Sequence, residues 1–121
     1  MTEQIGLPAP PPVGAHALVA GTFDDVCVFV TGGGTGLGKA IAAEFARLGA
    51  SLVIASRSED HLAAAREAME ALGAPALAVR CDIREAADVA AAFDAATDAF
   101  GLPGVLVNNA AANFPVPAED M

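Results

Sequence analysis

Along residues 26–111, short continuous apolar runs alternate with longer segments in which apolar residues recur at helical spacing. Short apolar runs occupy 26–30 ("VCVFV"), 51–56 ("SLVIAS"), 75–80 ("PALAVR") and 104–111 ("GVLVNNAA"), and their length and valine content are typical of buried strands. Helical spacing fills the intervals 38–49, 58–73 and 84–101. This β-α-β-α-β-α-β order predicts an α/β fold with a parallel sheet and right-handed crossovers.

Local signals set the expected helix ends. Gly49 and Gly73 stand where a glycine ends the first and second helices, and Ser58 is placed to cap the second. Asp82 is a candidate cap for the third helix. Asp24 and Asp25 are interpreted as a polar turn before the first strand, so no metal site is expected.

The charge balance narrows the possible partners. Six basic residues against fifteen acidic ones give a net charge of −9, which argues against nucleic-acid or anionic-membrane binding. No apolar run reaches the roughly 18 residues of a membrane span, and the N-terminus lacks the basic start of a signal peptide. Cys27 and Cys81 lie in or beside apolar runs and are expected to be buried thiols in a reduced compartment. A cytoplasmic location is therefore expected.

The first 20 residues differ from the rest in composition. They contain half of the eight prolines and no clear period, which predicts an extended leader in which Leu18 and Val19 are available to pack on the domain. Residues 21–121 are expected to form the domain itself.

Five glycines between Gly32 and Gly38 separate the first strand from the first helix. In a parallel sheet this is where anions bind, because the free amides of a helix N-terminus point at the ligand. The dinucleotide-binding fingerprint G-x-G-x-x-G does not match, because Lys39 occupies the position of its last glycine. The ATP-binding P-loop matches until Ala40, which has no hydroxyl for Mg²⁺.

A third spacing, T-G-x-x-x-G-x-G, is met by Thr31, Gly32, Gly36 and Gly38. Gly32 would allow a tight turn, Gly36 would let the backbone approach a pyrophosphate, and Gly38 would let the helix pack close to the strand. Here the sequence resembles the short-chain dehydrogenase/reductase family, from about Phe23 to the end. The resemblance implies the N-terminal half of a Rossmann-type, doubly wound parallel sheet with strand order 3-2-1-4.

The end of the second strand bears on the cofactor. A free ribose 2′-OH favours a carboxylate about 20 residues after the glycines, whereas Ser56 and Arg57 stand here. A guanidinium suits the 2′-phosphate of NADP, so NADP(H) is the expected cofactor.

The resemblance supplies further site residues. It implies that Asp82 contacts the adenine amino group with Ile83 beside the ring, and that "NNAA" corresponds to the family's N-N-A-G, from which Ala111 departs. Asn108 has a structural interpretation as well, tying a strand end to its neighbours. The complete candidate cofactor set is Thr31, Gly32, Gly34, Thr35, Gly36, Leu37, Gly38, Ser56, Arg57, Asp82, Ile83, Asn108, Ala110 and Ala111.

The quoted motifs look most like those of the 2,4-dienoyl-CoA reductases. This implies hydride transfer from NADPH to a fatty enoyl thioester or a carbonyl substrate, in a parent enzyme expected to be a homo-oligomer. The family's catalytic Tyr/Lys pair has no counterpart, because the sequence has no tyrosine and its single lysine is Lys39. The chain is therefore expected to be an inactive half, truncated before the catalytic half. The alternative is a stand-alone dinucleotide-binding or regulatory module.

Overall fold

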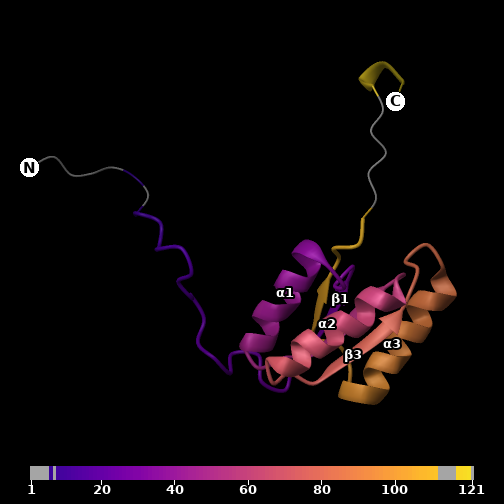
Figure 1. The fold of residues 1–121 in the computed structure, drawn as a ribbon, viewed down its shortest axis with the longest axis horizontal. Coiled ribbons are helices and arrows are strands. Elements are labelled where there is room, and N and C mark those ends of the chain that lie inside the picture. The colour runs from indigo at the N-terminus through magenta and orange to yellow at the C-terminus, as the bar shows by residue number, and fades with distance from the viewer. Residues whose placement is uncertain (1–5, 7, 112–116, 121) are drawn as a thin grey trace, which may run out of the picture.

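The computed structural model describes residue 6, residues 8–111 and residues 117–120. Four parallel strands form one sheet: β1 (Cys27–Thr31), β2 (Ser51–Ser56), β3 (Ala76–Arg80) and β4 (Val105–Val107). The helices α1 (Gly36–Arg47), α2 (Glu59–Ala71) and α3 (Ala86–Phe100) connect them, and a short 3₁₀ turn covers Ala118–Asp120. The strand order β3-β2-β1-β4 confirms the predicted doubly wound topology (Figure 1).

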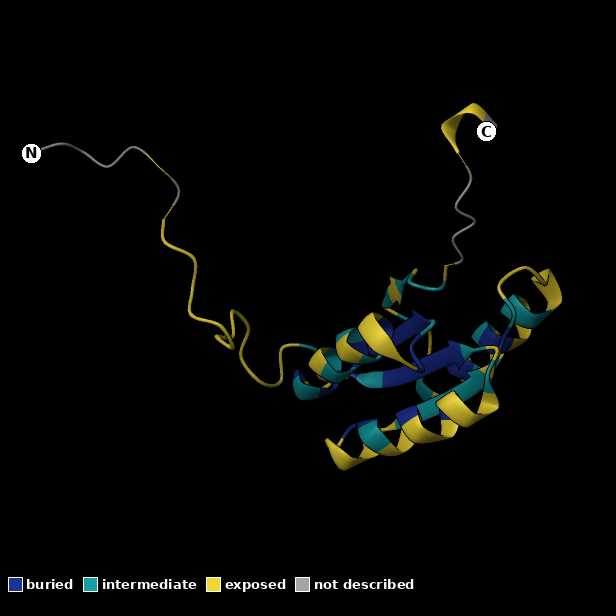
Figure 2. Ribbon diagram, turned by 45° about the horizontal axis from the view of Figure 1, so that its top comes forward, coloured by how far each residue is buried: buried dark blue, intermediate teal, exposed yellow. Residues whose placement is uncertain are grey.

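The central strands are buried because each contributes side chains to two cores. Alternate residues of a strand point to opposite faces, so Val28 and Val30 pack with α1 and α2 in one core, while Phe29 packs in the other with α3. The ring of Phe29 stacks on that of Phe93, with centroids 4.4 Å apart. Figure 2 shows this buried sheet between helices whose outer sides are exposed.

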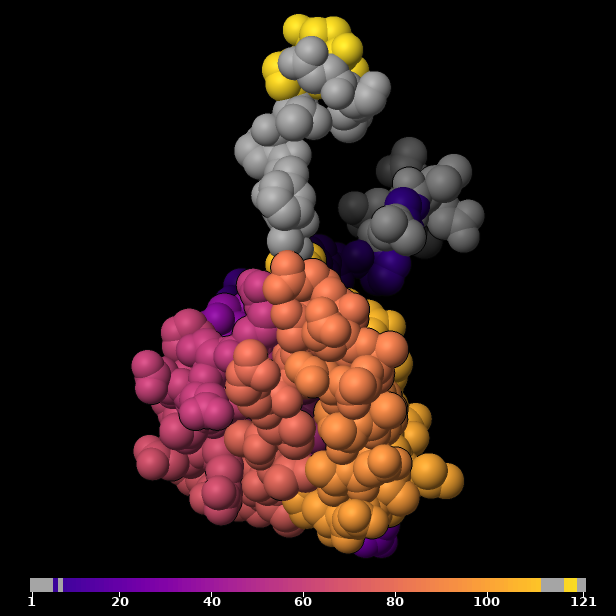
Figure 3. Space-filling view, turned by 90° about the vertical axis from the view of Figure 1, so that its right-hand side faces the viewer, coloured from indigo at the N-terminus to yellow at the C-terminus, as the bar shows by residue number. Residues whose placement is uncertain are grey.

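Small side chains let the helices approach the sheet closely. The buried helix positions include Ala42, Ala46, Ala65, Ala92 and Ala96. As the crossover rule predicts, α1 and α2 cover one face and α3 covers the other. The segment from α2 through β3 to α3 forms the side of the molecule shown in Figure 3.

The helix ends agree with expectation only in part. Gly49 and Gly73 end their helices with φ of +98° and +85°, as predicted. Ser58 is the N-cap position of α2, but its side chain makes no capping bond. The expected Asp82 cap is wrong, because α3 begins at Ala86 with Glu85 as its N-cap residue.

The fourth strand is shorter than the run 104–111 predicts. Its pairing with β1 ends at Val30 and Val107, one residue before β1 itself ends at Thr31. Residues 108–111 consequently lie in no strand and are free to turn towards that loop.

The part of the leader that the structure describes, residue 6 and residues 8–20, has no helix or strand (Figure 2). Leu18 lies against the domain, whereas Val19 points to solvent. No helix in the described part of the chain is long and apolar enough to cross a membrane.

Exposed apolar surface on β4 predicts self-association of the 121-residue chain. Among the described residues β4 pairs on one side only, Leu106 is 48% exposed, and α3 makes no close contact with β4. An open edge beside an apolar face is a template for association. We expect light scattering to show concentration-dependent oligomers, and Leu106→Lys to reduce them. Leu72→Lys, at a site 54% exposed at the end of α2, is the matched control. A monodisperse wild-type chain would contradict this.

Candidate functional site

A cleft of about 760 Å³ lies at the carboxyl ends of the strands, between the glycine loop, the turn after β2 and the loops after β3 and β4. Parallel strands bring such loops together at one edge of the sheet, which is where open α/β sheets bind ligands. The following predicted residues line it: Gly32, Gly34, Thr35, Gly36, Leu37, Ser56, Arg57, Asp82, Ile83, Ala110 and Ala111.

Three predicted residues do not line the cleft. Thr31 and Gly38 are buried behind the glycine loop, and Asn108 is exposed beyond the end of β4. Asn109, which follows Asn108, does line the cleft. The tie between strand ends considered for Asn108 is in fact made by Asn109, whose side-chain amide donates to the carbonyl oxygen of Gly32 at 3.2 Å.

Thr31 links the ends of β1 and β4. Its hydroxyl donates to the carbonyl oxygen of Val107 at 3.3 Å and accepts from the backbone amides of Asn109 and Ala110, each at 3.0 Å. Since Thr31 is buried, one hydroxyl satisfies three backbone groups at a place where the strand ladder has ended.

The glycines of the loop have different reasons to lack a side chain. Gly32 has φ +64°, and an added Cβ would lie 2.9 Å from the side-chain nitrogen of Asn109. A Cβ on Gly38 would overlap the carbonyl oxygen of Gly32, which confirms the close packing predicted for it. Gly36 has φ +56° but no neighbour within 4 Å of an added Cβ, so this side faces the open cleft.

The first turn of α1 provides a positive end to the cleft. Its N-cap residue Thr35 makes no side-chain capping bond, and no acidic residue lies in that turn. The first amides of α1 are therefore available to an anion, and the helix dipole favours one there. Leu37 and Ile83 add exposed apolar surface on the same cleft.

Arg84 fixes the charge state of Asp82. The side chain and backbone amide of Arg84 both donate to the Asp82 carboxylate, and these hydrogen bonds hold its pKa far below the ordinary range. The same interaction raises the pKa of Arg84. The pair is therefore ionised across the physiological range and is nearly neutral as a unit.

Several residues of the cleft were not predicted as site residues: Ala55, Ser58, His61, Cys81, Arg84 and Asn109. Arg84 follows Asp82 by two residues, the spacing at which an aspartate turns back onto the chain, so this signal was available. His61 is brought to the cleft by packing, since a Cβ on Gly34 would lie 3.0 Å from the Cβ of His61.

The two cysteines are free and buried, as predicted. Burial raises the pKa of the Cys27 thiol, and burial together with Asp88 and Asp82 raises that of Cys81. Cys81 lines the cleft but remains a neutral thiol at physiological pH, so it is not an activated nucleophile. No group of three or more potential metal ligands occurs in the part of the chain that the structure describes.

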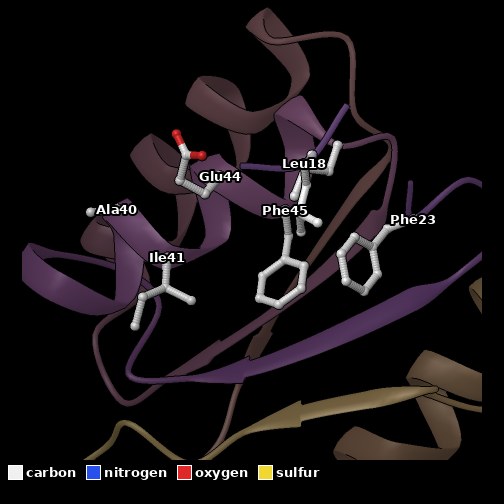
Figure 4. Close-up of a pocket in the computed structure, with 7 residues that line it drawn as sticks. Leu18, Phe23, Ala40, Ile41, Glu44 and Phe45 are labelled. Atoms are coloured by element: carbon white, nitrogen blue, oxygen red, sulfur yellow. The ribbon is translucent and has the colours of Figure 1, made fainter. Parts of the chain in front are cut away.

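A second hollow of about 380 Å³ lies on α1, away from these loops. Its lining is apolar and includes Leu18, Ile41 and the edge-to-face rings of Phe23 and Phe45 (Figure 4). Its one titratable side chain, Glu44, forms an ion pair with Arg47. This groove offers no groups for chemistry, so the cleft at the strand ends is the candidate site.

Known proteins resemble this chain across the region that builds the cleft. A family model described as short chain dehydrogenase matches residues 26–121. A Caenorhabditis elegans protein named as a probable 2,4-dienoyl-CoA reductase is 45% identical over 101 residues, covering 82% of this chain and 33% of that protein. The chain thus spans about a third of the length of such curated relatives.

Two solved structures show the same fold. A short-chain dehydrogenase/reductase from Burkholderia phymatum, in complex with NAD, aligns with a TM-score of 0.71 and 42% identity over 74% of this chain and 32% of that one. The L-sorbose reductase of Gluconobacter frateurii, complexed with NADPH and L-sorbose, aligns with a TM-score of 0.78 and 29% identity over 85% of this chain and 40% of that one.

Removing the Thr31 hydroxyl tests how the glycine loop is held. Thr31→Val keeps the shape but leaves two partly buried amides and one carbonyl without their partner, so we expect a loss of about 1–3 kcal/mol in the free energy of unfolding. Urea denaturation of the full-length protein that carries this sequence measures it. Thr97→Val is the control, because the Thr97 hydroxyl is exposed and bonds within α3. Equal stability of the two variants would show that the Thr31 hydroxyl does not hold the loop.

Proposed function

This chain belongs to the short-chain dehydrogenase family, and from that premise we propose that it is the NADP(H)-binding portion of a reductase. The reductase would transfer a hydride from NADPH to a fatty enoyl thioester or a carbonyl substrate. When bound, NADPH supplies the hydride. The residues described here bind and orient it.

The proposal rests on the backbone conformation of Gly36 and on the open space beside it. Gly36 has a backbone conformation that favours glycine, stands at the first residue of α1, and leaves open space where a side chain would be. A pyrophosphate placed there would face the free backbone amides of the first turn of α1, with no side chain of residue 36 in the way. The residues present therefore fit a dinucleotide.

The choice of NADP(H) rests on the turn after β2. The Ser56 hydroxyl accepts a hydrogen bond from the Ser58 amide at 3.3 Å, which shapes the turn that carries Arg57. Arg57 is exposed on the cleft and takes part in none of the ion pairs found among the described residues. Its guanidinium is thus available to a 2′-phosphate, and neither Ser56 nor Arg57, the residues at the end of β2, is a carboxylate that would repel one.

The proposed substrate class rests on the relatives of this chain. The relative named for 2,4-dienoyl-CoA reduction supports an enoyl thioester. The L-sorbose reductase with NADPH supports a carbonyl compound. The chain corresponds to only a third of such proteins, so the substrate-contacting residues are proposed to lie mainly outside it.

We propose that the proton donor of the reaction also lies outside these residues, because the sequence has no tyrosine and its only lysine, Lys39, lies in the first turn of α1. The alternative function, a dinucleotide-binding module without catalysis, uses the same cleft. The two differ in one observable: oxidation of NADPH in the presence of a dienoyl thioester or a carbonyl compound by the full-length protein that carries this sequence.

Gly36→Val tests the binding site itself. The valine side chain would fill the space proposed for the pyrophosphate, so we expect no detectable NADPH binding by calorimetric titration, with the circular dichroism spectrum retained. Gly73→Val is the matched control, because Gly73 also has positive φ and open space but lies at the end of α2. If both variants bind NADPH as the wild type does, the glycine loop serves only as a turn.

Arg57→Ala tests the cofactor preference. One charge-assisted contact to phosphate is worth about 1.5–3 kcal/mol, so NADPH affinity should fall roughly 10- to 100-fold. NADH affinity should change little, since NADH has no 2′-phosphate. Arg47→Ala removes another arginine, on α1, that pairs with Glu44, and should alter neither affinity. Equal losses for NADPH and NADH would exclude a role for Arg57 in choosing the cofactor.

A further inference from the structure

The Asp82 carboxylate is held by one neighbour from two directions. The backbone amide and Nε of Arg84 each donate to Oδ1 at 3.0 Å. Nε also lies 3.2 Å from Oδ2, and Nη2 donates to Oδ2 at 2.7 Å. A side chain held both by a backbone turn and by a planar guanidinium has little freedom to rotate.

The backbone of Asp82 is held separately by α3. Its amide donates to Oδ2 of Asp88 at 3.1 Å, and the same oxygen lies 3.9 Å from Nη1 of Arg80. The contact with α3 therefore fixes the position of the Asp82 backbone, and Arg84 fixes the orientation of its carboxylate.

The clamp also bears on Ile83, the residue between its two partners. Because the Arg84 amide turns back to Asp82 Oδ1, Ile83 forms the tip of a closed turn, with its side chain 49% exposed on the cleft. The Asp82 carboxylate and the Ile83 side chain thus lie next to each other on the cleft. In this arrangement the carboxylate can meet the edge of a planar heterocycle while the isoleucine contacts its face.

The Asp82 carboxylate has room for one further hydrogen bond. An ionised carboxylate has about four acceptor positions. The amide, Nε and Nη2 of Arg84 use most of them, while the Asp82 side chain is still 14% exposed to the cleft. Since the carboxylate stays ionised, it can accept from a ligand but cannot donate. It therefore suits one exocyclic amino group.

We propose that Arg84 is a positioning residue that makes the cleft selective for an amino-bearing purine, by holding Asp82 and Ile83 in place for the adenine ring. This rests on the proposed function, because it concerns the adenine end of the same cofactor. Arg84 acts through Asp82, and its own side chain is 72% exposed. Loss of Arg84 should thus change which base is preferred, in addition to how tightly the cofactor binds.

The experiment compares NADPH with its deamino analogue, in which hypoxanthine replaces adenine and a carbonyl replaces the amino donor. Dissociation constants are measured by fluorescence titration on the full-length protein that carries this sequence. A hydrogen bond to a charged group predicts a wild-type preference for NADPH of about 10-fold or more. We expect Arg84→Ala to reduce this ratio to about 1- to 3-fold, and Arg84→Lys to restore part of it.

Two further variants separate positioning from general destabilisation. Asp82→Asn should abolish the preference, and adding Arg84→Ala to it should lower the ratio no further, because both residues act through one contact. Arg66→Ala removes another exposed arginine, whose carboxylate partner Glu70 lies at 2.9 Å on α2, and should leave the ratio at its wild-type value.

The outcomes distinguish the inference from the function on which it rests. If wild-type protein binds NADPH and prefers it to the deamino analogue, but Arg84→Ala keeps the full ratio, the role of Arg84 is wrong and the dinucleotide site stands. A ratio that rises in Arg84→Ala would show that Arg84 competes with the base, which also overturns the inference. Absence of NADPH binding by the wild type would overturn both.

Discussion

The hydrogen bonds of Thr31 and Asn109 hold the glycine loop against the end of β4, and the geometry of the cleft depends on them. β1 and β4 stop pairing at Val107, so the backbone groups beyond that point need other partners. The Thr31 hydroxyl and the Asn109 amide provide them. Gly38 must lack a side chain because this contact brings the Gly32 carbonyl against the first turn of α1. Only then does Gly36 face an open space.

Local charge in the cleft differs from that of the whole chain. The net charge is −9, yet the cleft combines the positive end of α1 with Arg57, and Arg84 offsets the one carboxylate that lines it. An acidic surface elsewhere does not prevent anion binding here, because charges beyond about 10 Å are largely screened at physiological ionic strength. The negative composition thus argues against an extended polyanion as partner but is compatible with a single dinucleotide.

The division of the sheet into two cores explains why the described part of the chain is unevenly covered. Consecutive right-handed crossovers place α1 and α2 on one face and leave α3 alone on the other. Stacking of Phe29 on Phe93 anchors α3 over the centre of the sheet, towards β3 and away from β4. α3 therefore leaves Leu106 of β4 exposed on that face.

Sequence alone determined the element order, the parallel topology and the place of the cleft. These follow from hydrophobic period, from the handedness of crossovers and from glycines between a strand and a helix, all of which are local or general rules. The tertiary structure decided where β4 ends, that Asn109 and not Asn108 ties the loop, and that His61 reaches the cleft. Each of these depends on which side chain meets which backbone group across the sheet. That pairing is set by three-dimensional register, which no spacing along the chain encodes.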